Sequence, residues 1–150
     1  MIIYRNTTLE SSKNRVSGYA CVFEKESVNL GGFTEIIHRG AITQETIEKS
    51  DIFANLDHDP TYIIARSRNG KGSLKLSVDD IGLYFEFELP QTEKGNEIRS
   101  YLERDEITQC SFCFSLDVND KESQKWSIRN NTQYREIYKI DKLYDIALVF

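Results

Sequence analysis

Two histidines and a few serine, cysteine and aspartate side chains are the residues of this chain that could carry out nucleophilic catalysis. A serine nucleophile needs a base that takes its proton, and the base often needs an acid that orients it. Neutral histidine suits the role of base because its usual pKa lies close to working pH. The two candidates are His38, at the end of "FTEIIH", and His58, in the turn "LDHDP". His58 follows a predicted strand, so its ring could reach a neighbouring strand.

The segment "TQCSFCFSLDV" (108–118) offers the candidate nucleophile, Ser111. Its residues alternate between two faces. One face is apolar, with Cys110, Phe112, Phe114, Leu116 and Val118, and the other carries Ser111, Cys113, Ser115 and Asp117. A rigid strand that presents a small serine between bulky neighbours suits a nucleophile. The same pattern is also typical of a small residue on a half-buried strand, and a histidine between aspartates is also typical of a capping or surface residue.

Asp141 and Asp145, in the last strands of the chain, are the candidate acids, although both positions also fit solvent-facing residues. Cys113 is an alternative nucleophile, but no basic group adjoins it in sequence to favour its thiolate. Three cysteines, an odd number, argue against a disulfide framework. Cys110 and Cys113 form a C-x-x-C pair, yet zinc needs two further ligands and no histidine has a partner at ligand spacing. We therefore predict packing roles for the cysteines, no metal and no cofactor.

The composition excludes several classes of partner. The chain has 150 residues, a net charge of −5 and 39% hydrophobic residues, which predicts one soluble domain over residues 1–150. Its pI is near 5.1 and its basic residues are scattered, so we expect no nucleic-acid partner. No apolar run has the length of a membrane span, and "MIIYRNTTLE" lacks the features of a signal peptide. These features predict a cytoplasmic protein without a membrane partner.

The hydrophobic pattern predicts many short strands and two helices. The clearest element is a β-hairpin formed by 73–79 and 83–90, in which apolar and polar residues alternate on both sides of "DDIG". An amphipathic helix follows over 92–107, with an apolar stripe that ends near Leu102, and a short helix is expected over 41–50. The segment 119–133 is expected to be a loop or a loose hairpin. Further strands are expected over 16–23, 33–38, 51–56, 62–67, 108–118 and within 134–150.

Short connections between these strands favour a mainly β fold with some α (α+β), built as an antiparallel sheet or barrel.

Six segments in this order resemble the prohead proteases of tailed phages, from about Val16 to the C-terminus. They are "SGYACVF", "GGFTEIIHRGAI", "LDHDPTYIIARS", "LKLSVDDIGLYFEFELPQTEKGNEI", "ITQCSFCFSLDV" and "IDKLYDIALVF". The family is grouped with the herpesvirus assemblins, so the resemblance implies an antiparallel β-barrel surrounded by a few helices. It also implies a serine endopeptidase that cleaves scaffold or capsid-protein extensions, and itself, inside the assembling prohead in the host cytoplasm. Assemblin relatives are activated by dimerisation, so a homo-oligomer is possible on this resemblance.

The resemblance implies the catalytic residues His58 as general base, Ser111 as nucleophile and Asp145 as the orienting acid, with Asp141 as the alternative acid. Arg66, in "IIARS", matches an arginine that recurs in the family and is a candidate for a supporting role.

Three positions depart from the family's pattern. The family commonly has glycine where Cys113 stands, asparagine where Asp57 stands and glutamate where Asp145 stands. A carboxylate of Asp57 close to the His58 ring would raise the pKa of that histidine. A shorter aspartate at 145 must approach the ring more closely than glutamate would. Because of these departures, a catalytically silent capsid-assembly or scaffold-binding module remains an alternative to the protease, and a hydrolase that uses Cys113 is a third hypothesis.

Overall fold

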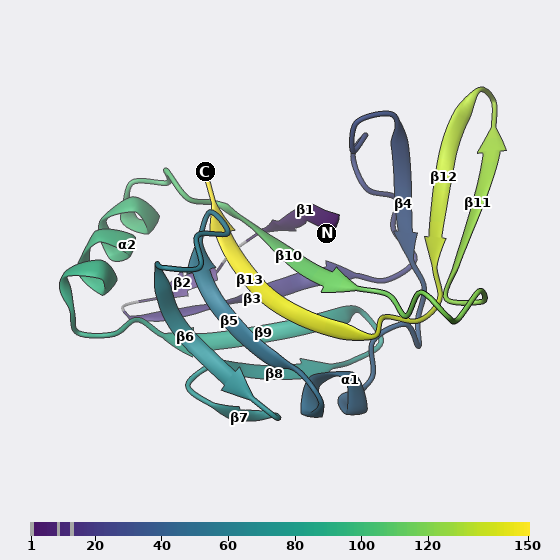
Figure 1. Cartoon of the computed structure of the whole chain (residues 1–150). Coiled ribbons are helices and arrows are strands. Elements are labelled where there is room, and N and C mark those ends of the chain that lie inside the picture. The colour runs from purple at the N-terminus through teal and green to yellow at the C-terminus, as the bar shows by residue number, and fades with distance from the viewer. Residues whose placement is uncertain (1, 9, 13) are drawn as a thin grey trace.

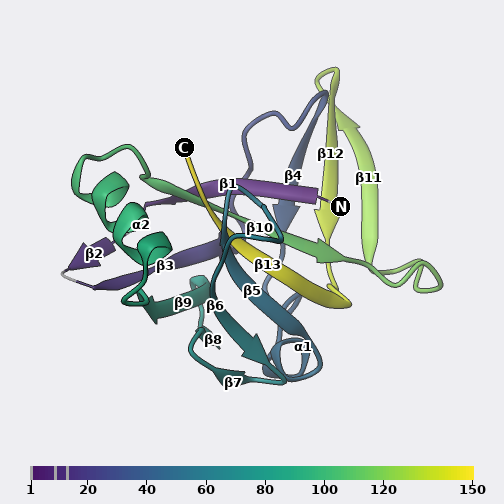
Figure 2. The ribbon, with the colours of Figure 1, turned by 60° about the vertical axis from the view of Figure 1, so that its left-hand side comes forward.

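The protein folds into three β-sheets and two short helices, here in a computed structural model (Figures 1 and 2) that describes residues 2–8, 10–12 and 14–150, with side chains from Asn14 onward. Sheet 1 has the strand order β1-β10-β13-β5-β6-β7, sheet 2 the order β2-β3-β9-β8 and sheet 3 the order β11-β12-β4. The elements are β1 (Ile2–Thr8), β2 (Glu10–Ser12), β3 (Arg15–Val22), β4 (Phe33–Ile37), α1 (Gln44–Glu48), β5 (Asp51–Leu56), β6 (Ile63–Arg68), β7 (Lys71–Gly72), β8 (Lys75–Val78), β9 (Gly82–Glu88), α2 (Glu93–Glu103), β10 (Gln109–Ser115), β11 (Gln124–Arg129), β12 (Thr132–Ile137) and β13 (Lys142–Val149).

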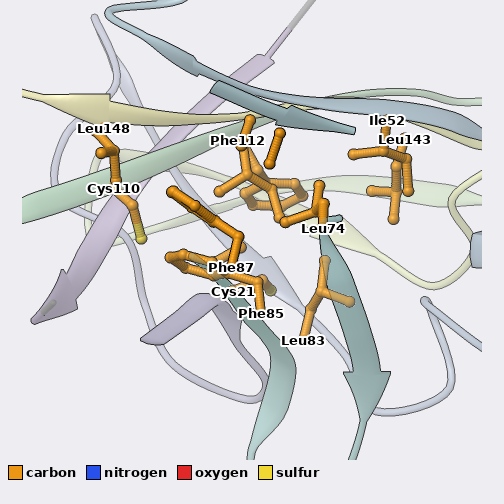
Figure 3. Packing of buried hydrophobic residues seen from close by; sticks show 14 of the residues in the cluster. Cys21, Ile52, Leu74, Leu83, Phe85, Phe87, Cys110, Phe112, Leu143 and Leu148 are labelled. Atoms are coloured by element: carbon orange, nitrogen blue, oxygen red, sulfur yellow. The ribbon is translucent and has the colours of Figure 1, made fainter. Parts of the chain in front are cut away.

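The hydrophobic core lies between sheets 1 and 2. In Figure 3, Phe112 and Leu148 of sheet 1 lie on the face of that sheet that is turned towards Phe85 and Phe87 of sheet 2. Phe85 and Phe112 are fully buried, at 0% exposure each. Burying apolar surface of this size is the main favourable contribution to folding. The core therefore covers one face of β10, β13 and β5, and leaves the opposite face of these strands for other residues.

The strongly patterned elements form as predicted. β8 and β9 pair as the expected antiparallel hairpin. The apolar face of β9 is buried in the core and carries Leu83, Phe85 and Phe87. The side chain of Thr92 caps α2 by accepting a hydrogen bond from the Gly95 N–H. The helix buries Ile98 and Leu102, where the apolar stripe was expected to end.

The helix predicted within 41–50 is present, and of the two alternatives for 119–133, a loop or a loose hairpin, the structure has a hairpin that extends from Gln124 to Ile137. Thr43 caps α1: its side chain accepts a hydrogen bond from the Thr46 N–H, and the side chain of Thr46 accepts one from the Thr43 N–H. Ile47, within the helix, is buried. β11 and β12 form the hairpin, which continues into sheet 3 through a parallel pairing of β12 with β4. In Figure 1 this sheet stands away from the other two.

Two predictions about individual segments are wrong. No strand was predicted before residue 16, yet β1 pairs along β10, because a partner more than 100 positions away in the sequence stabilises a segment with little alternation of its own. The strand predicted over 108–118 ends at Ser115. Val118, assigned to its apolar face, is therefore 93% exposed.

The mainly β, α+β class is confirmed, whereas the barrel stays a prediction. Eight of the described ladders are antiparallel and two are parallel, β12 with β4 and β13 with β5. The described strands form three separate sheets and no closed ring of hydrogen-bonded strands. The parallel pairing of β5 with β13 matters most for the site, because it places the carboxyl ends of both strands at the same edge of sheet 1.

Candidate active site

His58 lies in a tight turn that immediately follows β5. The N–H of Asp59 donates to the carbonyl of Leu56 over 2.9 Å, and the two residues between them, Asp57 and His58, both have left-handed backbone conformations, with φ of 54° and 61°. Aspartate and histidine are among the few residues that adopt this conformation at modest cost. The carboxylate of Asp59 then accepts hydrogen bonds from the N–H and hydroxyl of Thr61, which lower the pKa of Asp59. This turn reverses the chain, so that β6 returns antiparallel beside β5 in sheet 1.

The turn brings the imidazole of His58 to Asp145 in β13. The distance between His58 Nδ1 and Asp145 Oδ1 is 2.8 Å, and both side chains are largely buried, at 15% and 14% exposure. An ionised carboxylate only accepts hydrogen bonds, so Nδ1 carries the hydrogen of the pair. That tautomer leaves the lone pair of Nε2 available to take a proton.

Ser111 lies on β10, the strand next to β13. In the antiparallel register Ser111 is opposite Ala147 and Cys113 is opposite Asp145. Residues directly opposite each other point to the same face, so these four side chains share the face of sheet 1 that turns away from the core. Ala147 has the smallest side chain of any chiral residue, and both it and Ser111 are fully buried.

The candidate residues are enclosed, and their reactive atoms make no hydrogen bond to any described group. Ser111 is 0% exposed, and both its Oγ and the Nε2 of His58 are buried without a partner. Buried polar atoms are normally paired, so unpaired ones are expected at functional sites or beside bound water. The structure thus brings the histidine and the acid into direct contact, and it places the serine on the adjacent strand without a bond to the histidine.

Asn55 is a site residue that the sequence analysis did not single out. It is 2% exposed, and its Nδ2 donates to Asp145 Oδ2 over 3.3 Å. An amide on the other face of the short strand "DIFANL" from the apolar Ile52 and Ala54, three residues before His58, was the signal that could have identified it.

The alternative acid, Asp141, and the alternative base, His38, lie elsewhere. Asp141 precedes β13 and forms an ion pair with Lys49 at 3.1 Å. The pairing of β10 with β13 is irregular beyond Asp145, so Asp141 does not continue the alternation that begins at Asp145. His38 lies between the carboxylates of Glu24 and Glu136, at 2.8 and 3.1 Å from its two nitrogens, and both nitrogens are therefore engaged.

Cys113 is close to Asp145 but is a poor nucleophile there. Burial and the nearby charge of Asp145 raise the pKa of its thiol to about 11. The thiol therefore stays protonated at neutral pH, and the thiolate is the reactive form. All three cysteines are buried thiols that form no disulfide in the described part of the chain, which agrees with the packing roles predicted for them.

The side chains of Asp57 and Arg66 make no described hydrogen bond or ion pair with the candidate residues. Asp57 is exposed, and the carboxylate that bonds to His58 belongs to Asp145. Arg66 forms an ion pair with Asp51 and lies over the ring of Phe53 at 4.6 Å. Its charge is therefore engaged in a partly exposed pair. Among residues 14–150, no cluster of three or more histidine, cysteine or acidic side chains could hold a metal ion.

Comparison with known proteins identifies the family. A family model described as caudovirus prohead serine protease matches residues 3–150, nearly the whole chain, and the chain belongs to this family. The family is one of peptidases that act in phage capsid maturation, and the resemblance found in the sequence is confirmed. No curated protein and no solved structure matches the chain. No helix in the described part of the chain is long and apolar enough to cross a membrane.

Proposed function

We propose that this chain is a serine endopeptidase of phage capsid maturation, in which Ser111 is the nucleophile, His58 the general base and Asp145 the orienting acid. The observation that carries the proposal is the 2.8 Å hydrogen bond between His58 Nδ1 and Asp145 Oδ1, on the strand that pairs with the strand of Ser111. Membership of the prohead protease family supports the same chemistry. Residues 1–150 constitute one protease domain in this proposal.

Each residue has one role in the reaction. His58 Nε2 takes the proton of Ser111 as Oγ attacks a peptide carbonyl, and later gives that proton to the leaving amine. Asp145 holds the hydrogen on Nδ1 and stabilises the imidazolium that forms. The oxyanion of the intermediate needs backbone N–H groups or a cation, and Arg66 is a weak candidate for the cation because Asp51 already pairs with it.

The substrates proposed for this enzyme are the scaffolding protein, the extension of the capsid protein and the chain itself. They belong to the assembling prohead, so the proposed place of action is the prohead inside the host cytoplasm. The enzyme needs no cofactor in this mechanism, because the proton transfers and the covalent step use only side chains of the protein.

A second candidate function is a catalytically silent capsid-assembly or scaffold-binding module. It is favoured by the complete burial of Ser111 and by the absence of a described partner for its Oγ. A cavity of about 500 Å³ near the carboxyl end of β10 is lined by Ser115, Lys121 and Arg135 among others, but not by Ser111 or His58. A peptide therefore reaches the serine only if the site opens, and assembly into the prohead is one condition that could open it.

Labelling with a fluorophosphonate probe tests the proposal. We expect one adduct on the wild-type chain by intact mass, and none on Ser111→Ala or His58→Ala. Ser115→Ala is the matched control, because Ser115 lies on the same strand and face but bonds to Tyr144 at 3.0 Å, so this variant should label normally. No adduct on the wild type, either alone or with capsid and scaffolding proteins present, would favour the silent module.

A further inference from the structure

Asn55 bonds to the same carboxylate as His58. Its Nδ2 donates to Asp145 Oδ2 over 3.3 Å, while His58 Nδ1 bonds to Oδ1 over 2.8 Å. Each oxygen of Asp145 thus has its own donor. The terminal torsion of an aspartate is broad, so one hydrogen bond alone leaves the carboxylate free to turn. A second bond from a buried, rigid donor removes that freedom.

We propose that Asn55 is a positioning residue of the site, whose amide fixes the plane of the Asp145 carboxylate so that Oδ1 faces His58. The inference deepens the proposed function and rests on it in assigning a catalytic role to the His58–Asp145 pair. Asn55 contacts neither Ser111 nor the ring of His58 through any described hydrogen bond, so it acts through Asp145.

The backbone around Asn55 makes it suited to this role. Asn55 stands on β5 three residues before His58, and in the parallel register it is beside Ala147, which in turn is opposite Ser111. The amide therefore connects the strand that leads into the histidine turn with the strand that carries the acid. The pairing of β5 with β6 is irregular at the same position, because Ala54 is opposite Ala65 whereas Asn55 is opposite Ile63. Such irregularities often re-aim a side chain near an active site.

The type of residue also points to positioning rather than to packing. Asn55 Oδ1 is buried and makes no hydrogen bond to any described group, so the amide is only half satisfied. An amide kept for the stability of the fold would be expected to satisfy both of its ends. Aspartate has the same shape but would bring a second carboxylate to Asp145 instead of a donor, and leucine would bring no donor. Among residues of this size, asparagine alone supplies the N–H that Oδ2 needs.

Two variants and one matched control test the inference. Asn55→Ala removes the donor, and we expect the rate constant for fluorophosphonate labelling to fall by about 100-fold, as for other small misplacements of catalytic groups. Asn55→Asp keeps the shape, and the added negative charge near His58 favours the protonated ring. We therefore expect the acid side of its pH–rate profile to move to higher pH.

Ser50→Ala is the control for a loss of buried hydrogen bonds. Ser50 is 1% exposed, donates to the Thr46 carbonyl and accepts from the Leu143 N–H, just before the amino end of β5, whereas His58 follows the carboxyl end of that strand. This variant should lower the thermal midpoint but leave the labelling rate of the folded protein unchanged. Labelling of Asn55→Ala at the wild-type rate, with an unchanged pH profile for Asn55→Asp, would overturn the inference.

A proton NMR measurement separates failure of this inference from failure of the proposed function. The hydrogen on Nδ1 of a histidine bonded to a carboxylate gives a strongly deshielded resonance, which needs no catalysis to be observed. We expect this resonance in the wild type and its loss or broadening in Asn55→Ala. If the wild type is not labelled, the proposed function fails, and the resonance alone then decides the role of Asn55. A resonance that is unchanged in Asn55→Ala would contradict that role.

Discussion

His58 and Asp145 form a hydrogen-bonded pair, 2.8 Å between Nδ1 and Oδ1, although 87 positions separate them in the sequence. The pair depends on the parallel alignment of β5 with β13, since Asp57, the first residue after β5, donates its N–H to the Leu148 carbonyl. The chain then reverses direction in the turn. This reversal brings the imidazole of His58 to Asp145, three positions before Leu148 on β13. The alignment of two strands thus determines the orientation of the candidate base.

Replacing Asp145 with asparagine should nearly abolish activity. The amide can donate to His58 Nδ1, which favours the tautomer with its hydrogen on Nε2, and that tautomer cannot take the proton of Ser111. From the same change in serine proteases we expect the labelling rate to fall by about 10⁴-fold. The measurement is the rate of fluorophosphonate labelling, followed by intact mass.

Asp141→Asn is the matched control for this prediction. Asp141 forms a partly exposed ion pair with Lys49, and pairs of this kind contribute about 0–1 kcal/mol. Asp141→Asn should therefore label at nearly the wild-type rate. If instead Asp141→Asn were inactive and Asp145→Asn active, Asp141 would be the orienting acid and the arrangement proposed for this site would be wrong.

Elements with strong local patterns were the ones that could be predicted from the sequence. The hairpin of β8 and β9 and the helix α2 have clear alternation or a clear apolar stripe, and they carry their own turn and cap residues. β1 could not be predicted, because it forms through its pairing with β10 rather than through a pattern of its own. The parallel pairings within sheets 1 and 3 likewise join segments that are far apart in the sequence.

The candidate site was predicted in part, and the reason is similar. The motif resemblance indicated His58, Ser111 and Asp145, but it left Asp141 open because alternation alone does not reveal the irregularity in β13. Asn55 was missed because its role depends on a partner 90 positions away. No local pattern indicates that Ser111 is fully buried on the face opposite the core, since burial of both faces depends on the packing of the whole chain.

Thiol alkylation should not inactivate the protein. Burial and the charge of Asp145 raise the pKa of Cys113 to about 11, so only a minute fraction of this thiol is ionised at pH 7.5. We expect iodoacetamide to leave fluorophosphonate labelling unchanged, and Cys113→Ala to remain active. Loss of activity in Cys113→Ala with an intact fold, together with protection by substrate against alkylation, would support the cysteine hydrolase instead.

Enlarging Ala147 should disturb the site more than the fold. Ala147 is fully buried between Ser111 on one neighbouring strand and Asn55 on the other, on the face that also carries Asp145. Valine adds two methyl groups there, and we expect a stability cost of about 1–3 kcal/mol from overpacking. We also expect a fall in labelling rate of about 100-fold, because the added volume displaces the reacting side chains.

Ala54→Val separates these two effects. Ala54 is fully buried on β5 as well, but it belongs to the hydrophobic core on the other face of sheet 1. Urea denaturation should show a similar cost for both variants, while the labelling rate of folded Ala54→Val stays close to that of the wild type. Equal loss of labelling in both variants would mean that the site responds to stability in general and not to the volume of the side chain at position 147.

Glu35 should make the stability of the protein depend on pH. It is 0% exposed on β4 with Arg135 at 3.5 Å, and burial raises the pKa of its carboxyl from 4.5 to about 7. The folded protein therefore binds a proton more tightly than the unfolded chain does. This contribution is fully present below about pH 4.5 and is lost as the pH rises to about 7, with a slope of about 1.4 kcal/mol per pH unit.

The variant Glu35→Gln tests this prediction, because glutamine cannot titrate at this position. The difference in unfolding free energy, wild type minus Glu35→Gln, should thus decrease between pH 4.5 and 7, as measured by urea denaturation, and a difference that stays constant or increases would contradict the raised pKa.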